Sequence, residues 1–138
     1  MSAGRALALA VIVVVIAALG MGLWASGSPG TQREFRLDER RVSDLQGITA
    51  AIDRHFEVHR SLPPDLGALA EAPGSRLSTR DPVTGTAYEY EVVGERQFRV
   101  CASFAHDTAT DTFRLAAPWW HGAGRHCFDR RVRGDSEG

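Results

Sequence analysis

The sequence contains no lysine, and all 16 of its basic residues are arginine. They are balanced by 17 acidic residues, so the net charge at pH 7 is −1 and neither sign is in excess. Proteins that bind nucleic acid through their overall electrostatic field need a basic surplus. We therefore expect no nucleic-acid partner. The length of 138 residues fits one small domain with additional segments.

Sequence motifs of common enzyme sites are also missing. In the stretch DPVTGTAYEY, from Asp81 to Tyr90, the glycine spacing matches neither a Walker loop nor a dinucleotide fingerprint. Ser103 and Cys101 lack the flanking residues that mark a catalytic nucleophile. We therefore expect a protein that is not an enzyme and that binds no cofactor.

Metal ligands are present as residue types but not as a pattern. They show no Cys-x-x-Cys spacing and no dedicated calcium-loop pattern. The candidates for zinc are His55, His59, His106, His121, His126, Cys101 and Cys127, and those for calcium are Asp107 and Asp111. We expect no metal site, and we expect His55 and His59 to be hydrogen-bonded core imidazoles.

One long apolar run dominates the N-terminal segment. The 20 residues from Ala6 to Ala25 carry no charge, and as a helix they would extend ~30 Å, enough to cross a bilayer core. This predicts a membrane anchor over residues 1–25 that contacts the lipid bilayer through residues 6–25. A cleaved signal peptide is the alternative, because Ala25-Ser26-Gly27 offers small residues at a cleavage site. Signal-peptide cores usually span only ~7–15 residues.

An amphipathic helix is expected after a short linker. The stretch SGSPGTQ is typical of a linker, which we place at residues 26–36, and the helix runs from about Leu37 to Arg60, before a Pro-Pro pair. Apolar residues recur at spacings of three and four, which predicts one buried face. That face comprises Val42, Leu45, Ile48, Ile52 and Phe56, with Ala51 and His59 beside it. The charged residues, Arg41 and Asp44 among them, occupy the remaining faces of this helix.

Two stretches of alternating polarity predict a β-hairpin over residues 86–93 and 97–104. The preceding DPVTG is expected to be a turn, because Asp-Pro favours turn initiation and Gly85 can adopt a positive φ. Tyr88 and Tyr90 then share one face of the first strand, with Val92, and point into the core.

A third strand around residues 126–128 would complete the sheet. The chain is therefore expected to be an α+β protein. After the N-terminal transmembrane helix, a long amphipathic helix packs on a three- or four-stranded antiparallel sheet, and this domain spans residues 37–132. The polar residues 133–138 are expected to form a disordered tail.

The two cysteines, Cys101 and Cys127, fall in the second and third expected strands. We expect a disulfide between Cys101 and Cys127, which requires neighbouring strands, and two buried free thiols are the alternative. An even pair of cysteines in an anchored chain favours an oxidising compartment. Four arginines between residues 33 and 41 would by charge alone keep the domain in the cytoplasm, but long domains translocate largely regardless of such charges. We therefore expect a single-pass plasma-membrane protein with its C-terminal domain on the extracytoplasmic side.

Trp119, Trp120 and His121 form the one concentrated aromatic cluster outside the expected strands. We expect this cluster to cover the end of the sheet. The alternative is an interaction patch, in which these three residues would make the protein a small-ligand or metal-binding extracytoplasmic domain.

The order of these segments resembles the type IV pilin-like fold, and specifically the major pseudopilin of type II secretion systems. The matching segments are DLQGITAAIDRHFEVHRSLPPDLGAL (Asp44 to Leu69) and DPVTGTAYEY (Asp81 to Tyr90). The resemblance implies an extracytoplasmic domain packed on its own helix, a non-catalytic structural role, and envelope or secretion-assembly proteins as partners. The apolar run departs from that family, because it holds no acidic residue and no prepilin cleavage motif precedes it. The segment between the cysteines also differs from the family's calcium loop, so no calcium ligands are carried over.

Overall fold

The computed structural model describes residues 2–25, 28–108 and 117–133. Contacts divide the chain into two compact units, Met1–Glu34 and Phe35–Gly138. The first unit contains helix α1, Ala3–Ala25, in which no residue is buried. Among the described residues, one helix near the N-terminus is long and apolar enough to cross a membrane, judged by length and composition.

Helix α2, Pro29–His59, begins earlier than the expected start at Leu37. Residues 29–36 are therefore helical, and the expectation of a linker there is wrong. The reason is that Ser28 and Pro29 are residue types that favour the start of a helix. The Thr31 backbone N–H donates to Ser28 Oγ at 3.3 Å, and a proline at the first helical position has its φ already set.

The chain leaves α2 through a short series of turns. Arg60 has φ 54°, in the left-handed region that ends helices. The five-residue helix α3, Leu66–Ala70, follows the Pro-Pro pair. Asp65 caps it, because its side chain accepts a hydrogen bond from the Ala68 N–H at 2.8 Å.

The sheet contains β1 (Glu89–Gly94), β2 (Gln97–Phe104) and β3 (Gly124–Arg131), in the order β1-β2-β3 with both pairs antiparallel. This confirms the hairpin and the third strand. Outside this sheet, the described residues add only an isolated bridge between Arg80 and Ala87, so they give no support to a fourth strand.

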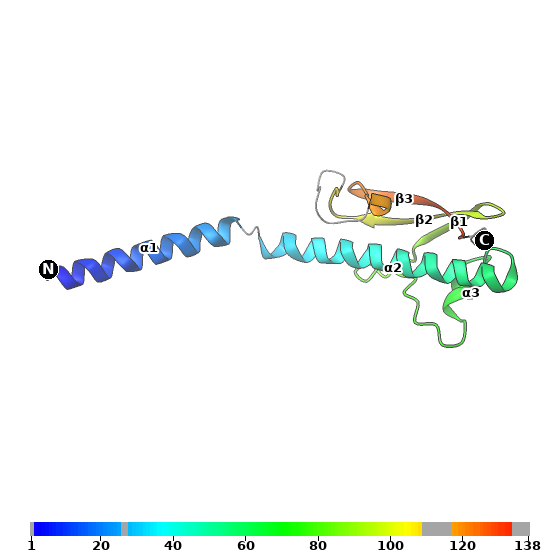
Figure 1. The fold of residues 1–138 in the computed structure, drawn as a ribbon, viewed down its shortest axis with the longest axis horizontal. Coiled ribbons are helices and arrows are strands. Elements are labelled where there is room, and N and C mark those ends of the chain that lie inside the picture. The colour runs from blue at the N-terminus through cyan, green and yellow to red at the C-terminus, as the bar shows by residue number, and fades with distance from the viewer. Residues whose placement is uncertain (1, 26–27, 109–116, 134–138) are drawn as a thin grey trace, which may run out of the picture. The chain divides into compact units, whose positions relative to one another are not determined.

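The core lies between α2 and one face of the sheet, and Figure 1 shows α2 running alongside the strands. All five residues of the expected helix face are buried, and Leu45, Ile48 and Ile52 are 0% exposed. Alternate residues of β2, together with one residue of β3, pack against this helix face. They are Phe98, Val100, Ala102, Phe104 and Phe128. Each fully buried large aliphatic side chain stabilises the fold by about 1.5–3 kcal/mol.

The first strand departs from its expected pattern at its end. Tyr88 is buried and Tyr90 is half-buried, but Val92 is 49% exposed although it was expected on the same face. The pairing of β1 with β2 shifts register between Val92 and Gly94. The end of the strand therefore loses the strict alternation that a regular ladder would impose.

Candidate functional site

A buried ionic cluster joins α2 to the DPVTG turn. Arg41 on α2 donates through Nε to Asp81 Oδ2 at 2.5 Å and through Nη1 to Asp38 Oδ1 at 2.7 Å. All three residues are buried, so their mutual attraction is screened far less than that of a surface pair. Arg41 lies outside the apolar face of α2 and is nevertheless buried, because it has two buried acceptors.

Asp81 accepts further hydrogen bonds that hold the turn together. The N–H groups of Val83 and Thr84 donate to Asp81 Oδ1 at 2.8 and 2.9 Å. Burial alone would raise the pKa of Asp81, but the hydrogen bonds from Arg41 and from these backbone groups lower the pKa to about 2. Gly85 has φ 69° and donates its N–H to the Asp81 carbonyl, which confirms DPVTG as a turn.

The second carboxylate of the cluster, Asp38, holds the chain just after β2. The N–H groups of Ala105 and His106 donate to it at 3.0 and 2.9 Å. The His106 ring stacks on Phe35 of α2, with ring centroids 4.0 Å apart. The cluster therefore connects α2 to the turn before β1 and to the end of β2, and it holds these three elements together.

The two tyrosines of the DPVTGTAYEY stretch add hydrogen bonds to the same helix and its end. The Tyr88 hydroxyl donates to Asp44 Oδ2 at 2.8 Å, and the Tyr90 hydroxyl donates to the Pro63 carbonyl at 3.0 Å. Burial, together with the bond to Asp44, raises the pKa of Tyr88. Burial raises the pKa of Tyr90 to about 12. Asp44 is half-buried, and its carboxylate accepts the hydrogen bond from Tyr88.

The Trp119-Trp120-His121 segment does not present three side chains to solvent. Trp119 is 8% exposed and lies under the Arg130 guanidinium, whose carbon is 4.0 Å from the ring centroid. His121 is 1% exposed and stacks on Phe104 at 3.7 Å, and burial lowers its pKa. Only Trp120, at 48% exposed, offers a large outer surface. A ligand patch of all three residues would require the core to open.

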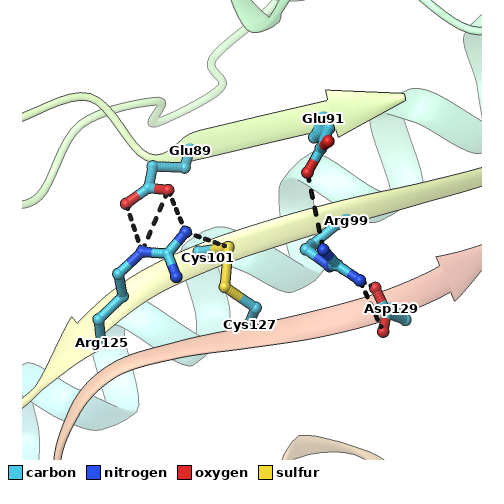
Figure 2. Close-up of a disulfide and its surroundings, with 7 residues drawn as sticks. All are labelled: Glu89, Glu91, Arg99, Cys101, Arg125, Cys127 and Asp129. Atoms are coloured by element: carbon cyan, nitrogen blue, oxygen red, sulfur yellow. Dashed lines mark hydrogen bonds and ion pairs between the residues drawn. A yellow bond between two sulfur atoms is a disulfide. The ribbon is translucent and has the colours of Figure 1, made fainter. Parts of the chain in front are cut away.

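Cys101 and Cys127 form a disulfide between directly paired positions of β2 and β3, as predicted. Figure 2 shows this bond on the face of the sheet that carries the charged residues. Arg125 lies over it, with Nη2 3.6 Å from Cys101 Sγ. The bridge therefore links the central strand covalently to β3.

Charged pairs cover the outer face around this bridge. Arg125 on β3 donates to Glu89 on β1, with Nη2 2.5 Å from Oε2, and so spans the central strand. Arg99 on β2 donates to Asp129 on β3, with Nε 2.6 Å from Oδ1 (Figure 2). The hydrogen bond from Arg125 lowers the pKa of Glu89, and that from Arg99 lowers the pKa of Asp129. These side chains are well exposed, so salt screens their attraction.

The candidate metal ligands do not gather into one larger group, although His55 and His59 lie one turn apart on α2. No group of three or more His, Cys, Asp or Glu side chains within the described ranges is arranged to hold a metal ion. The disulfide occupies both sulfurs, and Asp111 lies outside the described residues. His55 is half-buried and His59 is exposed, so the expectation that both are core imidazoles is wrong.

A cleft near the C-terminal end of α2 was not predicted from the sequence. Its apolar side includes Phe56, and the Arg96 guanidinium lies 5.2 Å from the centroid of that ring. The lining residues are Phe56, Arg60, Ser61, Leu62, Pro63, Pro64, Val92, Gly94, Glu95 and Arg96. The Pro-Pro pair is the sequence signal nearest to this cleft, because it ends the helix and both prolines line the cleft.

No protein-family model, curated protein or solved structure matches this chain. Arg41 pairs with Asp81 across elements that are distant in sequence, and the charges of the outer sheet face pair between strands. Both arrangements stabilise a domain.

Proposed function

We propose that this chain is a single-pass membrane protein whose α+β domain lies outside the cytoplasm and acts as a structural or interaction module. The observation that carries the proposal is helix α1. It contains 23 residues, none of which is buried, and its large apolar side chains are at least 50% exposed, including Trp24 at 89%. Such a surface is costly in water and favourable in a bilayer.

The disulfide supports the extracytoplasmic placement of the domain. Disulfides persist in oxidising compartments and are rare in the cytosol of mesophiles. The bridge joins two strands of the only sheet in the described part of the chain, so reduction would weaken the element on which α2 packs. A cytoplasmic domain of this design would have to fold without it.

The order of elements supports a relation to type II secretion pseudopilins. An apolar helix is followed by α2, by a Leu-Pro turn, and by an antiparallel sheet on which α2 packs. We propose association with envelope or secretion-assembly proteins on this ground. The proposal does not extend to prepilin processing, because α1 holds no acidic residue.

Topology in a bacterial membrane tests the proposal. The full chain, expressed in a bacterium, should remain in the membrane pellet after alkaline carbonate washing. Protease added outside intact spheroplasts should digest the domain from Phe35 onward. An intact mass that includes residues 1–25 would establish a retained anchor. A carbonate-soluble chain, or a domain that is protected until the cells are lysed, would contradict the proposal.

A matched pair of variants separates anchoring from folding. Deletion of residues 1–25 should release the domain from the membrane, whereas Val15→Ala, a smaller change within α1, should leave it in the pellet. A shortened chain that still sediments with membranes would mean that another surface binds lipid. A mass lacking the first 25 residues in the full-length protein would instead favour a cleaved signal peptide.

A further inference from the structure

Two histidines on α2 lie together at the surface, beside α3. His55 and His59 are one helical turn apart, and their rings are stacked, with centroids 4.1 Å apart and planes inclined by 19°. Both rings line a groove between α2 and the residues around α3, and Arg54 lines it with them. The pair is therefore accessible from solvent.

A backbone hydrogen bond orients one of these rings. His59 Nδ1 lies 3.0 Å from the His55 carbonyl oxygen. A carbonyl only accepts, so Nδ1 must carry the proton, and Nε2 of the neutral ring then keeps its lone pair. Metal-bound histidines almost always donate their other ring nitrogen to such an acceptor, which fixes the tautomer and the ring.

We propose that His55 and His59 form a two-imidazole site for a late first-row divalent cation such as Zn²⁺ or Cu²⁺. At Zn–N distances of ~2.0–2.1 Å, two nitrogens at a tetrahedral angle lie about 3.3 Å apart. Side chains four residues apart lie on the same face of a helix, so rotation of the His55 ring out of the stack can bring one nitrogen of each ring to that spacing. Water or a ligand from another molecule completes the coordination.

An imidazole binds a metal ion through the lone pair of a neutral ring nitrogen. Arg54 also lines the groove, and its charge opposes a cation. Imidazole prefers zinc, copper and nickel, whereas Ca²⁺ and Mg²⁺ require oxygen ligands. The site should therefore be weak but selective.

Titration of the full chain in detergent, purified with a tag that contains no histidine, tests the site. Calorimetry with Zn²⁺ should show one ion per chain, and Ca²⁺ at the same concentration should give no binding heat. His55→Gln and His59→Gln should each weaken Zn²⁺ binding by about tenfold or more. His126→Gln, which alters a histidine on β3, should leave it unchanged.

An independent measurement covers the case in which a variant disturbs the fold. With one equivalent of Cu²⁺, paramagnetic resonance of the unaltered chain should show nitrogen couplings from two imidazoles. Absence of Zn²⁺ binding at millimolar concentration would overturn the proposal. Binding that survives in the His55→Gln/His59→Gln double variant, or Cu²⁺ spectra without imidazole nitrogen, would also overturn it.

Discussion

The two faces of the three-stranded sheet are built from alternate residues of the same strands, yet they are held together differently. On the inner face of β2, Phe98 and Val100 are at most 1% exposed and pack on α2. On the outer face, Arg99 pairs with Asp129 in solvent, and the disulfide lies between strands. The inner face therefore depends on exclusion of water, and the outer face on a covalent bond and screened charges.

The ionic cluster at Arg41 sharpens this comparison. Like the outer face of the sheet, this cluster places an arginine between carboxylates, but here the side chains are buried. Burial strengthens the attraction between the opposite charges. It also raises the free-energy cost of leaving one of the charges without its partner. Loss of Arg41 should therefore have a much larger effect than loss of Arg99.

The largest effect is expected from Ile52→Asp, which places a charge in the inner face. Ile52 is 0% exposed, so the carboxylate would be buried without a partner. We expect a loss of more than about 5 kcal/mol, comparable with the whole stability of a small domain. Circular dichroism should show an unfolded domain. Val58→Asp is the matched control, because Val58 is 76% exposed and the same change there should be tolerated.

Arg41→Met should have the next largest effect. It leaves Asp38 and Asp81 buried without their cation, and breaking such a pair typically costs about 3–5 kcal/mol. Urea unfolding of the variant should show this loss, while Arg40→Met, at an exposed position of α2, should unfold like the unaltered chain. Equal midpoints for the two variants would mean that the cluster contributes no stability.

Removal of the disulfide should cost about 3.5 kcal/mol. The cysteines are 26 residues apart, and closing a loop of that length restricts the unfolded chain by roughly this amount. The Cys101→Ser/Cys127→Ser variant should melt at a lower temperature than the oxidised chain. Reducing agent should lower the melting temperature of the unaltered chain only, and a chain indifferent to reductant would contradict the role of the bridge.

Acid should remove about 2 kcal/mol through Asp81. Its pKa falls from 3.8 to about 2 on folding, so the stabilisation is complete above pH 3.8 and is lost as the pH falls towards 2. Urea midpoints measured between pH 6 and pH 2 should fall more steeply for the unaltered chain than for Asp81→Asn. If the urea midpoints of the two chains fell equally with pH, Asp81 would not be the source of this loss of stability in acid.

Elements with local signals were predictable from the sequence. The spacing of Leu45, Ile48 and Ile52 indicates the buried face of α2, and alternation indicates β1 and β2, because both patterns follow from backbone geometry. The turn at Asp81 was also visible in its residues. The start of α2 was missed because Ser28-Pro29-Gly30 is as typical of a linker as of a helix start.

The cluster around Arg41 was not predictable, because its partners are far apart in the chain. Asp81 is 40 residues from Arg41, and nothing in a helical pattern distinguishes an arginine with a distant acceptor from a solvated one. The exposure of His59 was missed for a similar reason, because it depends on where α2 ends.

The smallest effect is expected on the outer face, from the pair Glu89 and Arg125. Both side chains are more than half exposed, so their attraction competes with water and with the entropy of two long side chains. A double-mutant cycle with Glu89→Ala and Arg125→Ala should give a coupling well below the effects of Arg41→Met and of the disulfide. In 1 M salt, where the Debye length is ~3 Å, the coupling should vanish. A coupling that persists in 1 M salt would mean that this pair behaves like the buried cluster, and the distinction between the two faces would fail.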